Sequence, residues 1–274
     1  MSFLEQLETL RIMVVKKNAP AGDAPVRAPE GMSGLAKGLA IIEVFGMEHS
    51  QLTVTDAARL TDTTRAAARR CLLTLVELGY LSHDGKHFWP TPRFLRLGAA
   101  YLDAAPLPQL AQPHLASARE ALGESISLAV LEDGWSVFVA RAETAKVVTT
   151  GVRLGARLPA YGSATGQVLL AGLSDEAIQR YLVNPPPPTT AYMIVDPSVI
   201  MTRVQRARTE GVAFTDEELE LGMRSMAVPV RNAQGKVVAA MSISTFSARL
   251  SLEELREQCL PVLQHHAAVL GCML

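Results

Sequence analysis

The segment from residue 52 to residue 98 constrains the fold most, because two short helix patterns, a polar turn and a hairpin signal follow one another in it. The first helix pattern begins after Thr53, which lies three residues before Asp56. This spacing resembles a capping box, in which side chains satisfy N–H groups at the helix start, although Asp is shorter than the usual Glu or Gln. The spacing therefore predicts a helix that runs to about Leu60.

A second helix is predicted from about Thr64, a suitable N-cap, to Leu78, because Gly79 suits the position just past a helix end. Asp62 lies in the intervening turn, where Asp tolerates a left-handed backbone. The side of this helix that faces the core is expected to carry Ala68, Cys71, Leu72 and Leu75.

A hairpin is predicted directly after the second helix. Asp84 and Gly85 separate residues 80–82 from residues 87–89, and Asp-Gly in such a place is a strong signal for a two-residue turn. Two helices, a turn and a hairpin in this order predict a winged helix-turn-helix, a fold that places one helix in the major groove of DNA.

The second predicted helix carries the charge expected of a DNA-reading helix. Arg65, Arg69 and Arg70 lie in its first two turns, and Arg65 and Arg69 share one face. The alternative is an ordinary helix surface whose arginines meet only solvent. The candidate contacts with double-stranded DNA are Thr64, Arg65, Arg69, Arg70, Lys86 and His87.

The charge of the chain is concentrated rather than large. The 274 residues carry a net charge of −1, whereas residues 33–98 hold eight Lys or Arg and six Asp or Glu, which gives +2. This distribution suits a protein that reads one DNA sequence without binding every polyanion. Three widely spaced cysteines predict neither a disulfide framework nor a metal site. Without a membrane-length apolar run or an apparent signal peptide, we expect a cytoplasmic protein with no membrane contact.

The length and the hydrophobic content of 49% allow two domains. Residues 1–17 hold a short amphipathic pattern, either a dimerisation accessory or a frayed tail, and the Ala-, Pro- and Gly-rich residues 18–32 predict a flexible tether. The predicted boundaries are 1–32 for this N-terminal extension, 33–91 for the winged helix-turn-helix, 92–106 for a linker helix and 107–274 for an effector-binding domain.

The second domain alternates predicted helices and strands. Residues 105–108 are expected to break the chain before a helix over 109–122. Strands are predicted over 126–131, 135–141, 147–152, 226–230 and 237–245, with a hairpin turn at 132–134. Helices are predicted over 165–171, 174–182 and 197–210 and from about Leu252 onward. The predicted fold class is α+β: an N-terminal winged helix-turn-helix, a linker helix and a C-terminal α/β domain with a mostly antiparallel sheet.

Several segments, in order, resemble the IclR family of bacterial transcriptional regulators. They are residues 33–42, the helix-turn-helix, RLPAYGSATGQVLLA at 157–171 and GMRSMAVPV at 222–230. Residues 102–115 are similar to the linker region of the subgroup that senses aromatic acids such as 4-hydroxybenzoate and protocatechuate. The resemblance implies a regulator of aromatic catabolism genes that binds an operator as a homodimer or dimer of dimers, with RNA polymerase as a further candidate partner. The alternative is a family member that senses a non-aromatic small organic acid.

The chain departs from the family pattern at three places. Residues 62–64 read Asp-Thr-Thr where the family turn usually has Gly-Leu-Ser. Gln167 stands where a basic residue is common, and Gly162 and Ala164 replace bulkier or polar residues of the effector loop. These departures concern the contacts with the effector rather than the fold.

The resemblance implicates the loop before 165–171, the segment before Ser225 and the last strand in effector binding. The N–H groups at a helix start suit an anionic oxygen, and the period of a strand puts Ser242 and Ser244 on one face. The predicted effector contacts are Tyr161, Ala164, Thr165, Thr215, Ser225, Ser242 and Ser244. The alternative is that the serines bond one another or backbone groups inside the sheet.

An aromatic acid also needs an apolar slot and often a cation. Trp135 and Phe138 lie on opposite faces of a regular strand, so at most one of them lines such a slot together with Tyr161. The candidate cations are Arg141, Arg153, Arg157 and Arg224. An exposed salt bridge is the alternative for each, and Arg224 is expected to be structural because family members with different effectors share its motif.

The interpretation of this chain as an enzyme is weaker than its interpretation as a regulator. Ser163 invites comparison with a nucleophile elbow, but Tyr161 and Thr165 occupy the two positions that require glycine. We therefore expect no catalytic residue. A purely architectural DNA binder is also weaker, because it would leave the large second domain without a role.

A metal or redox sensor would have to use Cys259, Cys272, His265 and His266. The two histidines are adjacent and so point about 100° apart on a helix, which is poor for joint ligation. We expect no metal and no other cofactor.

Overall fold

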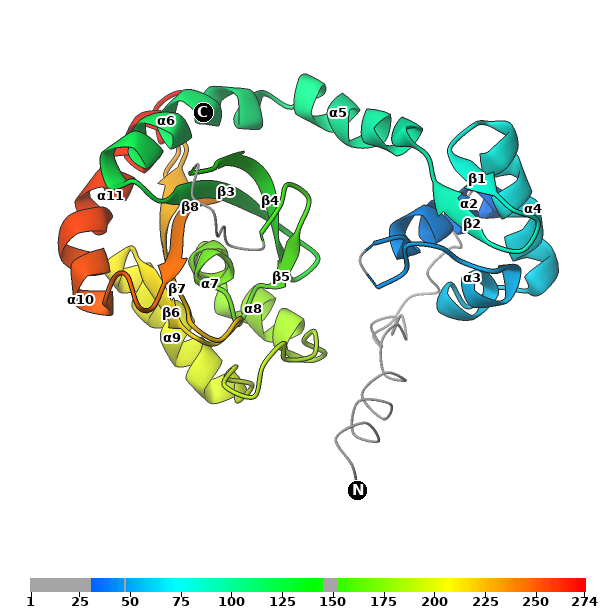
Figure 1. The fold of residues 1–274 in the computed structure, drawn as a ribbon. Helices are drawn as coiled ribbons and strands as arrows, with labels where there is room; N and C mark the ends of the chain where they lie inside the picture. The colour runs from blue at the N-terminus through cyan, green and yellow to red at the C-terminus, as the bar shows by residue number, and fades with distance from the viewer. Residues whose placement is uncertain (1–30, 47, 145–151) are drawn as a thin grey trace. The chain divides into compact units, whose positions relative to one another are not determined.

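The computed structural model describes residues 31–46, 48–144 and 152–274, and the chain divides into two compact units, residues 1–99 and 100–274 (Figure 1). The amphipathic pattern of 1–17, most of the predicted tether and nearly all of the predicted 147–152 strand lie outside the described residues. No helix within the described ranges is long and apolar enough to cross a membrane.

The N-terminal unit is a winged helix-turn-helix. It contains α2 (Ser33–Val44), α3 (Val54–Leu60), α4 (Arg65–Glu77), β1 (Leu81–His83) and β2 (Phe88–Pro90). Thr53 and Asp56 form the predicted capping box, the Thr64 side chain caps α4, and Asp62 has a left-handed backbone with φ 47°. Cys71 is only half-buried, whereas the shared core holds Ile41, Leu52, Ala68, Leu72, Leu75, Leu81 and Phe88.

The turn of the wing is longer than predicted. The strand register leaves residues 84–87 as a four-residue turn, so the two-residue turn expected at Asp84 and Gly85 is wrong. The Asp84 carboxylate accounts for the difference. Its Oδ1 accepts hydrogen bonds from the N–H groups of Lys86 and His87 at 2.9 and 2.7 Å, which closes the wider turn.

The chain leaves the wing through the 3₁₀-helix η1 (Pro92–Phe94) and through α5 (Leu95–Ala104). The predicted break over 105–108 shrinks to one residue, because α6 (Pro106–Leu122) begins directly after Ala105. Pro106 and Pro108 lie in the first turn of α6, where a missing N–H removes no helical hydrogen bond. The prolines therefore start this helix instead of delaying it.

The C-terminal unit is built on a six-stranded antiparallel sheet with the strand order β5–β4–β3–β8–β7–β6. Its strands are β3 (Ser125–Glu132), β4 (Trp135–Ala142), β5 (Arg157–Pro159), β6 (Ala213–Asp216), β7 (Met223–Arg231) and β8 (Val237–Phe246). The four long strands confirm the predicted ones. The edge strands β5 and β6 have no counterpart in the sequence prediction, because three or four residues are too few for a period of two to stand out.

The two faces of this sheet carry different side chains. The outer face, covered by α6 and α11 (Leu260–Gly271), is apolar and holds Ile126, Leu128, Met226, Met241 and Ile243. On the opposite, inner face, α7 (Ala164–Ala171) packs against small side chains, namely Ala213, Ala227 and Ala240 (Figure 1). Both faces arise from the same strands, because successive residues of a strand point to opposite sides.

Two other helices begin at or next to the predicted positions, each with a side-chain cap. Ser174 caps α8 (Asp175–Leu182), and Asp196 caps α9 (Pro197–Glu210). The predicted C-terminal helix is interrupted, since α10 (Leu252–Glu254) passes through the π-helical turn η2 (Leu255–Cys259) before α11 begins. Pro261 lies two residues after this turn and has no N–H to donate, which favours a local change in helix type.

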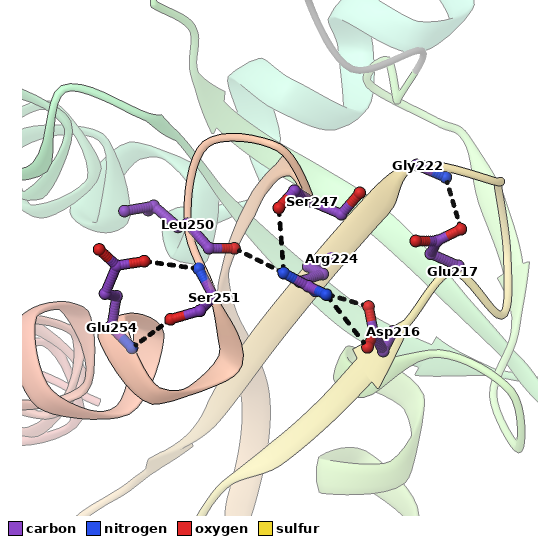
Figure 2. A network of polar contacts seen from close by, with 8 residues as sticks. All are labelled: Asp216, Glu217, Gly222, Arg224, Ser247, Leu250, Ser251 and Glu254. Carbon is purple, nitrogen blue, oxygen red and sulfur yellow. Dashed lines mark hydrogen bonds and ion pairs between the residues drawn. The ribbon is translucent and has the colours of Figure 1, made fainter.

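Arg224 joins the edge of the sheet to the segment before α10 (Figure 2). Its Nε donates to Asp216 Oδ1 at 2.6 Å, and its Nη1 donates to the carbonyl oxygens of Ser247 and Leu250 at 3.0 and 3.1 Å. The same guanidinium thus holds β6, β7 and the chain after β8, which is a structural role.

We expect Gly166→Ala to destabilise the C-terminal unit, because a Cβ at this position would clash with the Ala160 carbonyl oxygen. Overpacking against backbone should lower the free energy of unfolding by on the order of 1–3 kcal/mol. Urea unfolding followed by circular dichroism measures this loss. Gly98→Ala is the matched control, because a Cβ there meets nothing within 4 Å. Equal unfolding midpoints for the two variants would contradict the close approach of α7 to residue 160.

Candidate functional site

The helix α4 presents its arginines to solvent. Arg65, Arg69 and Arg70 are all exposed. Among the described residues of this unit, ion pairs form within α3 and within the wing, and none of them includes these three arginines. Thr64 uses its hydroxyl oxygen to accept a hydrogen bond from the Ala67 N–H at 3.2 Å, and its hydroxyl proton can still be donated to a phosphate. These groups form one basic surface at the start of α4.

The wing contributes two further predicted DNA contacts. Lys86 is exposed and His87 is half-buried, with its Nδ1 3.2 Å from Asp84 Oδ2. Hydrogen bonds from the His87 N–H, the Lys86 N–H and the His87 ring hold the pKa of the Asp84 carboxyl well below its usual range. The carboxylate therefore stays charged and keeps the wing turn closed at neutral pH.

The inner face of the sheet carries a group of hydroxyl side chains that lie opposite one another in the strand register. We call this group the hydroxyl patch; it consists of Ser125, Ser127, Thr215, Ser225, Ser242 and Ser244. Opposite residues of antiparallel strands share a face and lie within reach of one another. The patch therefore brings together four of the predicted effector contacts, those on β6, β7 and β8.

The hydroxyl patch is largely buried and partly bonded within itself. Ser225 and Ser244 share a hydrogen bond of 3.1 Å, which is the alternative considered from the sequence for such serines. Ser125 Oγ accepts a hydrogen bond from the Thr144 N–H at 3.2 Å. A hydroxyl has one donor site and two acceptor sites, so one such bond does not exhaust its capacity for a ligand.

Two members of the hydroxyl patch, Ser125 and Ser127, are absent from the predicted contacts. They belong to the alternating stretch Ser-Ile-Ser-Leu at 125–128, in which the apolar residues face the outer core. This alternation with a period of two is the sequence signal from which both serines could have been predicted to face the inner side.

Arg141 joins the hydroxyl patch from β4. It lies opposite Ser127, its side chain is only 3% exposed, and its Nη1 donates to Ser127 Oγ at 3.0 Å. This arrangement differs from the exposed salt bridge that was the alternative for each arginine. The cause is a β-bulge, because the register shifts between Leu128 and Ala129 and so places Arg141 on the inner face together with Phe138.

The other candidate cations lie elsewhere. Arg153 and Arg157 are exposed, and the Arg157 guanidinium carbon lies 4.9 Å from the centre of the Trp135 ring, a cation–π contact. Phe138, 4% exposed, is the member of the predicted aromatic pair that faces inward.

The start of α7 contains two predicted effector contacts, Ala164 and Thr165. The Ser163 Oγ caps this helix by accepting a hydrogen bond from the Gly166 N–H at 3.1 Å. Ser136 Oγ donates to Thr165 Oγ1 at 2.7 Å, which fixes that side chain against β4. The N–H groups of the first helical turn have no intrahelical acceptor, so they remain the part of α7 suited to an anionic oxygen. Ser163 therefore serves as the N-cap of α7.

Tyr161 is almost fully buried beside α7. Its hydroxyl donates to the Pro186 carbonyl oxygen at 2.8 Å, and burial raises the pKa of the phenol. The hydroxyl thus engages the proline-rich loop, and the ring packs in the same core as Met193.

A cavity of about 290 Å³ lies beside the edge strand β6. Its arginines are paired with acids. Arg203 Nη1 donates to both carboxylate oxygens of Glu218 at 2.8 and 2.7 Å, and Glu210 pairs with Arg206 and Arg256. Paired charges give this cavity little preference for an anion, and Thr215 of the hydroxyl patch is among its lining residues.

Cys259 is poorly suited to a redox sensor. Burial, together with the nearby carboxylates of Glu124 and Glu254, raises the pKa of the Cys259 thiol to about 11. The thiol therefore stays protonated and unreactive at neutral pH. Over the residues that the structure describes, no three His, Cys, Asp or Glu side chains are arranged to hold a metal ion.

Two segments of this chain match known protein families. Residues 34–85 match the family described as "IclR helix-turn-helix domain". Residues 99–270 match the one described as "Bacterial transcriptional regulator IclR C-terminal".

The chain is also similar to individual regulators. It is 38% identical to the Pca regulon regulatory protein of Pseudomonas putida over 86% of this chain and 81% of that protein. It is 37% identical to the p-hydroxybenzoate hydroxylase transcriptional activator of Acinetobacter baylyi over 90% of this chain and 94% of that protein. A solved IclR homologue from Microbacterium hydrocarbonoxydans, complexed with 4-hydroxybenzoate, matches with a TM-score of 0.72 and 25% identity over 87% of this chain and 98% of that chain.

We expect alanine at Arg65, Arg69 and Arg70 together to abolish specific duplex binding. Loss of one arginine that reads a guanine edge should cost about 1–3 kcal/mol of discrimination. Loss of a phosphate contact should weaken all duplexes alike and reduce the salt slope by about one. Gel shifts test this with a duplex selected by the wild-type protein and with scrambled DNA, at two salt concentrations. Lys236→Ala, which removes an exposed charge from the other unit, is the control; unchanged binding by the triple variant would refute the role of α4.

Proposed function

The chain belongs to the IclR family of bacterial transcriptional regulators, and we propose that it controls aromatic catabolism genes in response to a small aromatic carboxylate. The first candidate effector is 4-hydroxybenzoate, followed by protocatechuate. The observation that carries the proposal is the buried hydroxyl patch of the inner sheet face, with Arg141 beside it. The relatives named above support the aromatic class, because they are regulators of the Pca regulon and of p-hydroxybenzoate hydroxylase.

The chemistry of the patch suits such a ligand. Hydroxyl groups can donate hydrogen bonds to a carboxylate, and they can both donate hydrogen bonds to a phenol and accept them from it. Ser, Thr and Arg side chains can therefore bind both the carboxylate and the hydroxyl of a hydroxybenzoate. Phe138 offers an apolar ring on the same face. We propose Thr215, Ser225, Ser242 and Ser244 as contacts, with the N–H groups of Ala164 and Thr165 and the Tyr161 ring at the border of the site.

Control of transcription requires more than binding. The operator is read by the winged helix-turn-helix through Arg65, Arg69, Arg70 and the wing. The effector must have different affinities for the conformations that bind DNA well and poorly, because equal affinities shift no equilibrium. If the protein activates transcription, RNA polymerase is a further partner. Because the operator lies on the bacterial chromosome, the proposed site of action is the cytoplasm.

We expect the protein to bind 4-hydroxybenzoate and protocatechuate in titration calorimetry, and pyruvate weakly or not at all. Replacing both Ser242 and Ser244 by alanine should weaken binding at least about tenfold, because a hydrogen bond to a charged partner contributes about 1.5–3 kcal/mol. Ser117→Ala is the control, because Ser117 is exposed on α6, which covers the opposite face. Binding of pyruvate alone would reject the aromatic proposal and favour a family member that senses a non-aromatic acid.

We also propose that the protein is a homodimer or a dimer of dimers. One winged helix covers one half-site, and half-sites about one helical turn apart require a second copy. Support comes from apolar side chains that α2 and α5 leave 44–76% exposed: Leu35, Leu39, Leu95, Leu97 and Tyr101.

Light scattering at micromolar concentration is expected to give at least twice the chain mass, with and without DNA. Leu95→Glu should raise the monomer fraction, because it places a charge on the exposed apolar surface. Met273→Glu, at another exposed apolar position, is the control. A wild-type protein that is monomeric under both conditions would rule out this proposal.

A further inference from the structure

Gln167 is a polar side chain of α7 with hydrogen-bonding capacity to spare inside the C-terminal unit. The residue is 3% exposed, and its Nε2 donates to the Tyr161 carbonyl oxygen at the long distance of 3.4 Å. Among the described residues, no hydrogen bond reaches its Oε1. A carboxamide has two donor and two acceptor sites, and buried sites without a partner are unfavourable. The unused sites of Gln167 therefore call for a polar partner.

Gln167 and Thr215 both line the cavity of about 290 Å³ beside β6. Thr215 is 4% exposed, and within the described part of the chain its hydroxyl has no hydrogen-bond partner. Over the same residues, Thr245 Oγ1 is the one polar side-chain atom that is both sealed and without a partner. The free atoms of Gln167 and Thr215 are therefore not sealed, and they open onto the cavity. Its volume is at the lower end of the range for small-molecule sites, about 300–1,000 Å³.

The charges of this cavity cancel. Three arginines and three acids line it: Arg203, Arg206, Arg256, Glu210, Asp216 and Glu218. Each of these arginines is paired with one of these acids. Hydrogen bonding from Arg206 holds the pKa of the Glu210 carboxyl below its usual range, so this group stays charged at neutral pH. A ligand carboxylate would meet carboxylates here, whereas an uncharged hydroxyl group meets no such repulsion.

Thr215 connects the cavity to the hydroxyl patch. It lies opposite Ser225 of β7, and Ser225 lies opposite Ser244 of β8. Adjacent strands are about 4.8 Å apart, so β8 and β6 are separated by about 10 Å across the inner face. A ligand that binds over Ser225 and Ser244 therefore has the cavity within reach of its far end.

We propose that the cavity receives the ring hydroxyl of the effector and that Gln167 is the residue that recognises it. The inference rests on the proposed function and names the group that distinguishes a hydroxylated aromatic acid from a plain one. Gln167 Oε1 accepts a hydrogen bond from the phenol, and the second Nε2 proton or the Thr215 hydroxyl donates one to the phenol oxygen. The carboxylate of the effector stays over the hydroxyl patch, away from Glu210 and Glu218.

The test compares 4-hydroxybenzoate with benzoate, which has the same charge but no hydroxyl, by titration calorimetry on the full chain. Wild-type protein is expected to prefer 4-hydroxybenzoate at least about tenfold, because benzoate leaves buried polar groups without a partner. Gln167→Leu should lose most of this preference by weakening 4-hydroxybenzoate and sparing benzoate. Gln205→Leu, the same substitution at an exposed position of α9, should keep it. Thermal melts establish that each variant is folded.

The outcomes separate the two proposals. Wild-type protein that binds neither compound overturns the proposed function and this inference together. Equal wild-type affinities for the two acids, or a preference that persists in Gln167→Leu, overturn only this inference. Equal weakening of both acids in Gln167→Leu also overturns it, because a purely structural residue affects both ligands alike. If Gln167→Leu does not fold, Thr215→Val decides: loss of 4-hydroxybenzoate affinity alone supports the inference, and any other result overturns it.

Discussion

The alternation of side chains along six antiparallel strands determines what the C-terminal unit can do. Because successive residues face opposite sides, Ile126 and Met241 can enter the outer core only if Ser127 and Ser242 face the inner side. The helices α6 and α11 close the apolar side, which stabilises the fold by burying apolar area. The inner side carries hydroxyls, and a buried hydroxyl without a partner costs about 1–3 kcal/mol. The same strands that build the core therefore produce a surface that needs polar partners, from its own residues or from a ligand.

One irregularity changes the composition of that surface. Strict alternation from Trp135 would place Arg141 on the outer face with Trp135, six residues earlier in β4. The bulge adds Val139 as an extra residue opposite the step from Leu128 to Ala129, and the parity of the strand reverses. Arg141 and Phe138 consequently share the inner face. A single unpaired residue in one strand thus brings a cation to the side that already carries Phe138 and the serines.

Comparing the structure with the sequence predictions distinguishes features that depend on neighbouring residues from features that depend on residues far apart in the chain. The caps formed by Thr53 and Thr64 were predictable, because these side chains act on backbone groups within a few residues of themselves. The hydroxyl patch was predictable in part, since a period of two places Ser242 and Ser244 together. Its assembly with β3, β6 and β7 depends on strand pairing between distant segments. The edge strands and the bulge depend on pairing too, which is why the inward position of Arg141 could not be derived from the sequence.

The charge distribution of the C-terminal part of the chain bears on any anionic ligand. Residues 99–274 hold 14 Lys or Arg and 17 Asp or Glu, so this part of the chain carries a net charge of −3 and does not attract an anion as a whole. Most arginines among its described residues are paired with acids, as Arg203 is with Glu218 and Arg224 with Asp216. Attraction must therefore arise locally, where water is excluded and a single charge acts at short range. On the inner face, the serines and threonine supply direction and hydrogen bonds but no charge. The bulge places a charge of this kind, that of Arg141, on the inner face beside these groups.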